Sequence, residues 1–126
     1  MKLKLPYPVS ANRYWKTRAV KNFAQTYLSA EARDYRRQVM RIAADFRAVQ
    51  GDVSIGLVLA PKLTKKNEAS KVLMDLDNSI KVTLDALIGV VYVDDKQVKR
   101  ITAEYGQPEV GGALYVTVKE MECLSE

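Results

Sequence analysis

The sequence contains no histidine among its 126 residues. This absence excludes a Ser-His-Asp triad, a Cys-His pair and any zinc site built on imidazole ligands. Catalysis by this chain would have to rest on Asp, Glu, Lys, Tyr or Arg side chains, or on a metal ion.

Cysteine and long apolar runs are also scarce. The single cysteine, Cys123, cannot form a disulfide within the chain, which is typical of a reducing compartment. Residues 1–8 contain no long apolar run, so the sequence predicts neither a signal peptide nor a membrane span. We therefore expect a cytoplasmic protein that makes no membrane contact.

The composition that is left is that of a globular protein. With 48% hydrophobic and 28% charged residues, the chain predicts a single domain over residues 1–126 with a core of its own. Its 20 Lys and Arg residues outnumber its 15 Asp and Glu residues, and the pI is about 9.3. This excess of positive charge favours nucleic acid as the partner.

One stretch, residues 75–95, has the opposite charge, and we call it the acidic segment. It holds five of the fifteen acidic residues and one basic residue, a net charge of −4, whereas residues 1–74 carry +10. Carboxylates gathered beside a cationic surface favour a hard metal ion that meets a polyanion.

Apolar spacing predicts the secondary structure around the acidic segment. Strands are expected over residues 2–9, 53–60, 97–105 and 114–118. Residues 10–28 show no clear period and are expected to form a long loop, and residues 62–74 a basic loop. Glu109–Gly112 predicts a hairpin turn into the last strand.

Two amphipathic helices are expected, over residues 30–48 and 77–88. Ser29 is a suitable N-cap for the first helix, whose apolar residues recur from Tyr35 to Phe46 at helical spacing. Gly89 is a suitable left-handed stop for the second. The predicted fold is α+β, with the two helices packed on a mixed or mostly antiparallel sheet.

The acidic segment carries the candidate chemistry. Asp75 and Asp77 are two residues apart before a helix, so an extended backbone would place both carboxylates on the same side. Asp77, Lys81 and Asp85 then recur every four residues along one helical face. A fold that brought the Asp94-Asp95 turn back past the start of the helix would gather three carboxylates around one point.

Oxygen ligands of this kind suit Mg²⁺ or Mn²⁺, which keep several waters and bind substrate phosphates. Such ions generate hydroxide and stabilise both oxygens of an in-line phosphoryl displacement, and Lys81 would neutralise charge developing on the phosphate. Simpler interpretations stay open. In these interpretations, Asp75 or Asp77 serves only as an N-cap, Asp77 and Lys81 form an ordinary surface ion pair, and Asp94 and Asp95 are turn residues.

Several motifs resemble the RusA-type Holliday-junction resolvases of bacteria and their phages. The matching residues are Asp75-Leu76-Asp77-Asn78 with Lys81 and Asp85-Ala86-Leu87, Leu5–Tyr14, Ser29-Ala30-Glu31 with Tyr35-Arg36, Val93-Asp94-Asp95 with Gln97-Val98, and Gly111-Gly112. Two departures bear on DNA contacts. Val72-Leu73-Met74 stand where the family can have arginines, and Val9 and Ala11 replace a common Pro and Asn.

The resemblance implies a RusA-like domain and a homodimeric, Mg²⁺-dependent endonuclease that nicks two strands of a four-way DNA junction in recombination and repair. It implies no organic cofactor, and a bacterial or phage source. By position, Asp75, Asp77 and Asp95 match the family's catalytic, metal-binding carboxylates, and Lys81 matches its catalytic lysine.

Polar and basic side chains in the two expected loops are predicted to contact DNA. They are Asn12, Arg13, Lys16, Arg18, Lys62, Lys65, Lys66 and Lys71. The adjacent aromatic residues Tyr14 and Trp15 either stack on unpaired bases or belong to the core.

Two other functions stay open at this point. One is a non-catalytic protein that binds nucleic acid, and the other is a nuclease that acts on flap or duplex DNA. The sequence fixes neither the dimer interface, nor the cleavage preference, nor the roles of Asp85 and Asp94.

Overall fold

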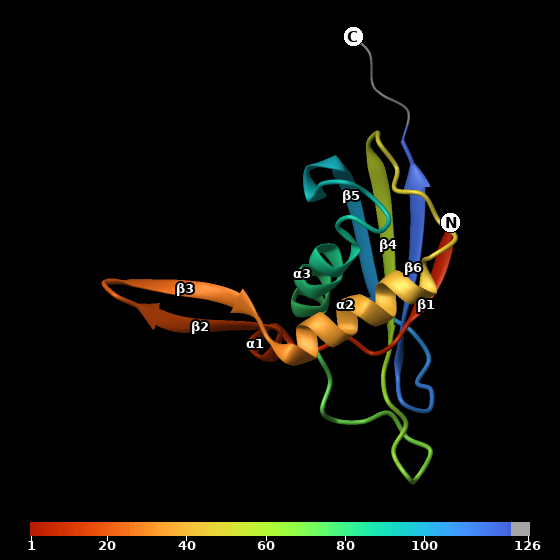
Figure 1. Cartoon of the computed structure of the whole chain (residues 1–126). Coiled ribbons are helices and arrows are strands. Elements are labelled where there is room, and N and C mark those ends of the chain that lie inside the picture. Colours follow the sequence, from red (N-terminus) through yellow and green to blue (C-terminus); the bar gives the residue numbers. More distant parts are fainter. Residues whose placement is uncertain (122–126) are drawn as a thin grey trace.

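A computed structural model describes residues 1–121 of the chain (Figure 1). The strands are β1 (Lys2–Leu5), β2 (Trp15–Val20), β3 (Phe23–Leu28), β4 (Val53–Ala60), β5 (Val98–Tyr105) and β6 (Ala113–Glu120). The helices are α1 (Ala11–Tyr14), α2 (Ala30–Ile42) and α3 (Leu76–Leu87), with a 3₁₀ turn, η1, at Asp95–Gln97. Cys123 lies outside the described residues.

Four strands form the main sheet, in the order β1-β6-β4-β5. β4 runs parallel to β5 and antiparallel to β6, and β6 runs antiparallel to β1. The mixed sheet expected from the sequence is therefore confirmed. Since β4 and β5 are parallel, the chain must cross the length of the sheet between them, and α3 lies in this crossover.

The core lies between this sheet and the two long helices, which cover the same face of it (Figure 1). Alternate residues of β4, from Val53 to Leu59, are buried against Tyr35 and Val39 of α2 and Leu87 of α3. The predicted α+β class is confirmed. No helix within residues 1–121 has the length and apolarity needed to cross a membrane.

The start of α2 agrees with the prediction, but its end does not. The Ser29 hydroxyl accepts from the backbone N–H of Ala32 at 3.0 Å, as expected of an N-cap. The helix stops at Ile42 rather than at residue 48, because Val49 pairs with the segment at residues 91–92 and needs an extended backbone. Phe46 still packs on the core, from the turn that follows the helix.

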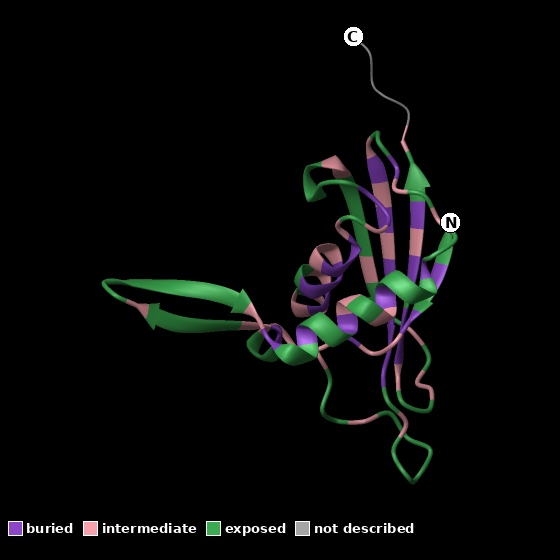
Figure 2. Cartoon of the chain, in the orientation of Figure 1, coloured by how far each residue is buried: buried purple, intermediate pink, exposed green. Residues whose placement is uncertain are grey.

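The expectation of a long loop over residues 10–28 is wrong. Residues 11–14 form α1, and β2 and β3 form an antiparallel hairpin that projects from the body of the molecule (Figure 1). We call residues 15–28 the arm. Its strands are exposed over almost their whole length (Figure 2). With no buried face, the arm has no apolar alternation by which a strand is predicted.

Two smaller expectations about the strands are also wrong. The first strand ends at Leu5 instead of residue 9, because prolines at positions 6 and 8 cannot donate ladder hydrogen bonds. Gly111 and Gly112 have the positive φ angles of a turn, at 77° and 69°, but they do not close a hairpin. β5 and β6 are separated by β4, so the connection between them crosses one end of the sheet.

Candidate active site

Asp75 and Asp77 lie at the N-terminal end of α3, and both are exposed. Asp75 occupies the N-cap position with an extended backbone, yet its carboxylate makes no capping hydrogen bond. The interpretation of Asp75 as a structural cap is therefore not supported. Both carboxylates are available to a ligand, at a helix end whose dipole stabilises negative charge.

An open cleft of about 650 Å³ lies beside Asp75. Its walls come from the segment after β1, from α1, from the basic loop and from the start of α3: Tyr7, Pro8, Val9, Ser10, Arg13, Lys62, Ser70, Val72, Leu73, Met74, Asp75 and Asn78. A second hollow, of about 600 Å³, lies on strands β4, β5 and β6, and none of the predicted site residues lines it. The first cleft is thus the one lined by predicted site residues, with Asp75 on the same walls as Arg13 and Lys62.

Three contacts hold the walls of this cleft together. The backbone N–H of Ala11 donates to the Asn78 side chain at 2.7 Å, and the N–H of Met74 donates to the Tyr7 hydroxyl at 3.2 Å. The Lys62 ammonium lies 4.9 Å from the centre of the Tyr7 ring. The opening segment and the basic loop, which are more than fifty residues apart, are in this way fixed around Asp75.

Lys81 lies one helical turn after Asp77 and is exposed. Within residues 1–121, it forms no ion pair with Asp77 or with Asp85. The alternative of an ordinary surface ion pair is therefore not what the structure shows. Its ammonium is therefore available to a ligand, one helical turn from Asp77.

Asp95 lies far from Asp75 within the chain. The hydroxyl of Tyr105, at the end of β5, donates to the carbonyl of Met74 at 2.9 Å, so Asp75 is at that end of the strand. Asp95 lies just before Val98, at the opposite end of β5. The strand itself is about 23 Å long, at roughly 3.3 Å per residue. In the described part of the chain, no three acidic or cysteine side chains are placed to hold a metal. The expected return of the Asp94-Asp95 turn to the helix start is therefore wrong for a single chain.

Asp94 has a structural task instead. Its carboxylate accepts from the backbone N–H of Lys96 at 2.9 Å, and that hydrogen bond lowers the pKa of Asp94. Gln97 completes a capping box by accepting from the N–H of Asp94, and its amide donates to the carbonyls of Val49 and Gly51. Asp94 thereby shapes the turn that presents Asp95.

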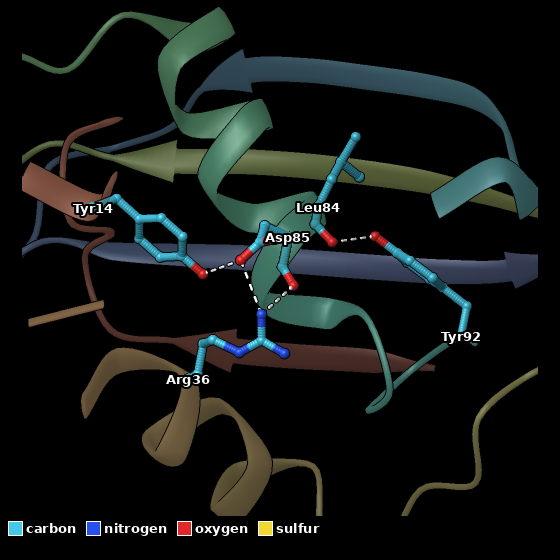
Figure 3. Close-up of polar contacts among 5 residues, drawn as sticks. All are labelled: Tyr14, Arg36, Leu84, Asp85 and Tyr92. Carbon is cyan, nitrogen blue, oxygen red and sulfur yellow. Dashed lines mark hydrogen bonds and ion pairs between the residues drawn. The ribbon is translucent and has the colours of Figure 1, made fainter. Parts of the chain in front are cut away.

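Asp85 joins three helices (Figure 3). Its carboxylate accepts from the Tyr14 hydroxyl of α1 and from the Arg36 guanidinium of α2, the latter at 2.9 Å. Tyr14 is fully buried, and this burial, with the neighbouring Asp85, raises its pKa well above the usual range. Tyr14 is thus a core residue, which settles one of the two alternatives left by the sequence. Nearby, the hydroxyl of Tyr92 donates to the carbonyl of Leu84 at 2.6 Å.

The contacts of Tyr14 and Arg36 with Asp85 could not be predicted from the spacing of these residues in the sequence. They can be tested by a change in stability. Asp85→Ala would leave a buried hydroxyl and a half-buried guanidinium without an acceptor, and should cost about 1–3 kcal/mol of unfolding free energy. Chemical denaturation measures this loss. Asp34→Ala is the matched control, because the exposed pair of Asp34 with Arg37 is worth at most about 1 kcal/mol. If both changes lowered the unfolding free energy equally, the contact among the three helices would contribute no more than an exposed ion pair.

The predicted DNA-contacting residues fall into three groups. Arg13 and Lys62 line the cleft, where Arg13 also pairs with Glu31. Lys65, Lys66 and Lys71 are exposed in the basic loop, and Asn12 is exposed on α1. Lys16 and Arg18 lie on β2, out along the arm. The structure thus brings Arg13 and Lys62 to the cleft that Asp75 lines, whereas Lys16 and Arg18 lie away from it on the arm.

The chain matches the family model described as endodeoxyribonuclease RusA over residues 6–119. It is 34% identical to the crossover junction endodeoxyribonuclease of Enterobacteria phage HK97, over 94% of this chain and 92% of that protein. It is 33% identical to the proteins of the same name from Enterobacteria phage 82 and Escherichia coli strain K12, over 93% of this chain and 92% of each relative.

Proposed function

The chain belongs to the RusA family of endodeoxyribonucleases, and from this premise we propose that it resolves four-way DNA junctions by paired nicks. One observation carries the proposal. The carboxylates of Asp75 and Asp77 are exposed, the Asp75 side chain makes no capping bond, and the adjacent cleft contains Arg13 and Lys62. Binding a DNA phosphodiester requires cationic groups that position its phosphate, and its metal-dependent hydrolysis requires hard oxygen donors that hold the ion.

The donor set suits Mg²⁺, with Mn²⁺ as a substitute, because such ions are held by one or two carboxylates together with substrate phosphates. Asp75 and Asp77 would hold the ion, which when bound activates water and stabilises the oxygens of the phosphoryl displacement. Arg13 and Lys62 position the DNA backbone in the cleft. Lys81 offers its ammonium to charge that develops on the scissile phosphate. This chemistry serves recombination and repair in a bacterial or phage-infected cytoplasm.

We further propose that two copies of the chain complete the site. β5 is an edge strand with exposed Ile101 and Tyr105, and α3, packed beside it, has a half-buried apolar stripe of Leu76, Ile80 and Leu84. A two-fold axis through this face sets the two β5 strands antiparallel. Asp95 of one copy then approaches the Asp75 end of β5 in the other copy. The partner thus supplies the carboxylate that lies too far away within a single chain.

Mixed dimers test this arrangement. Homodimers of Asp77→Asn and of Asp95→Asn should both be inactive. A heterodimer of the two variants should recover single-strand nicking, because one of its two shared sites has only native carboxylates. The control heterodimer, Asp75→Asn with Asp77→Asn, should stay inactive. If the Asp77→Asn/Asp95→Asn heterodimer is also inactive although it forms, each site belongs to one chain.

The function itself is tested with synthetic DNA. The native protein is incubated with a four-way junction, a flap and a simple duplex, each with Mg²⁺ or with EDTA. Paired, metal-dependent nicks in the junction alone support the proposal. Junction DNA that is bound but stays intact in Mg²⁺ would make the protein a binder, and equal cutting of the flap or duplex would make it a less selective nuclease.

The basic loop gives a further expected result. Replacing Lys65, Lys66 and Lys71 together by Ala should weaken junction binding and reduce the slope of log affinity against log salt. Each phosphate contact that is lost lowers the slope by about 0.9, because fewer counterions are released. Fluorescence anisotropy over a salt series measures it. An unchanged slope would mean that these exposed lysines are only solvated.

A further inference from the structure

The arm is the part of the molecule that neither the core nor the cleft explains. Its fourteen residues include Lys16, Arg18 and Lys21 and no acidic residue. The arm projects away from the sheet and the long helices, and its side chains are exposed along both strands (Figures 1 and 2). A two-stranded hairpin of this kind has little stability of its own. Because the arm adds little to the core, its exposed side chains are candidates for a function.

The two faces of the arm differ in chemistry. Residues directly opposite each other in an antiparallel pair share a face. One face therefore combines the pairs Lys16–Tyr27, Arg18–Gln25 and Val20–Phe23, and we call it the contact face. The opposite face consists of Trp15–Leu28, Thr17–Thr26 and Ala19–Ala24, and has no charged residue. The cations of the two strands, Lys16 and Arg18, thus share one face with the rings of Phe23 and Tyr27, while Trp15 at the base belongs to the opposite face.

Side chains in the middle of the contact face hold one another in place. The Arg18 side chain donates from Nε to the Gln25 amide oxygen at 3.0 Å, and its guanidinium lies 5.1 Å from the Tyr27 ring centre. The other guanidinium nitrogens point to no protein acceptor within residues 1–121. At the tip, Phe23 exposes 62% of its surface, so its ring is available to a partner outside the protein.

The base of the arm is firmly held. Ser29 donates from its hydroxyl to the carbonyl of Arg13 and from its N–H to the carbonyl of Tyr14, and Tyr14 is fully buried. The six-residue strands extend about 20 Å from that base, the length of roughly six stacked bases. The base of the arm is therefore anchored beside α1, while its tip is exposed to a partner outside the protein.

We propose that the arm is a β-ribbon that reads the branch point of the DNA junction. Lys16 and Arg18 contact phosphates, and Phe23 and Tyr27 stack on bases that are unstacked where the strands exchange. A two-stranded ribbon fits a DNA groove, and apolar wedges are used to open base steps. The absence of acidic residues from the arm and the aromatic–cationic face favour DNA over a protein partner. The inference rests on the proposed function and adds the device by which a junction is preferred to a duplex.

The test uses binding in EDTA, so that no cleavage is involved. A four-way junction with 2-aminopurine beside the branch point reports unstacking by increased fluorescence, and competition with unlabelled duplex gives the preference for the junction. The variants are Phe23→Ala, Tyr27→Ala and Arg18→Ala. The matched control is Thr17→Ala with Thr26→Ala on the opposite face. Light scattering gives the oligomeric state of each variant.

The aromatic variants should lose the fluorescence increase and about tenfold or more of the junction preference, the effect of one lost base–aromatic stack. Arg18→Ala should mainly reduce the salt slope, and the control should behave as wild type. If the aromatic variants keep the preference and the signal, the inference is wrong while junction nicking by the wild type still supports the proposed function. If they instead become monomers, the arm binds a second copy of the chain and not DNA.

Discussion

Asp75→Asn and Asp77→Asn should each abolish junction nicking and leave junction binding intact. The replacement keeps the size and the polar character of the side chain but removes the charged oxygen that a divalent ion needs. No positive charge is lost, so the affinity for DNA should hold or rise. Single-turnover cleavage in Mg²⁺ and gel-shift binding in EDTA measure the two properties separately.

Stability is the necessary check on this result. Asp75 makes no capping hydrogen bond and both side chains are exposed, so neither change should lower the melting temperature appreciably. Asp45→Asn is the matched control, because Asp45 is exposed in the turn after α2 and lies outside the cleft. A variant at Asp75 or Asp77 that cleaves at nearly the wild-type rate would remove that residue from the active site.

The parts of the fold with a buried face were predictable. β4 alternates between buried and half-buried positions, and Ser29 and Gly89 take the cap and left-handed conformations that their residue types favour. The arm was not predictable, because its exposed strands leave no periodic signal. The end of α2 was missed because Phe46 continues the helical spacing from a turn, where it packs on the core by other means.

The candidate site was predictable only in part, for a topological reason. Asp75, Asp77 and Lys81 are close in sequence, so a helix that starts near Asp75 was enough to place all three at the N-terminal half of α3. Asp95 depends on the direction of β5, which runs parallel to β4, and α3 must return along the sheet before that strand begins. The sequence could not show this crossover, nor the meeting of Tyr14, Arg36 and Asp85 across three helices.

The other large effect is expected at Lys81, in the reaction step and not in folding. The side chain is exposed, and Asp85, one of its two neighbours at a spacing of four, is already paired with Arg36. Lys81→Ala should therefore change the stability by at most a few tenths of a kcal/mol, the value of one helical pair. If the ammonium meets the scissile phosphate or orients the attacking water, its loss should slow cleavage by about 100-fold or more.

Lys81→Arg is the sharper variant. It keeps the positive charge but replaces a compact ammonium by a planar fork, which should not restore the geometry of a point contact. Single-turnover cleavage of a four-way junction at saturating Mg²⁺ is compared for both variants, alongside melting temperature, junction affinity and oligomeric state. Slow cleavage with the other three properties unchanged places Lys81 in the chemistry. Full activity of Lys81→Ala would make it a solvated lysine on the surface of α3.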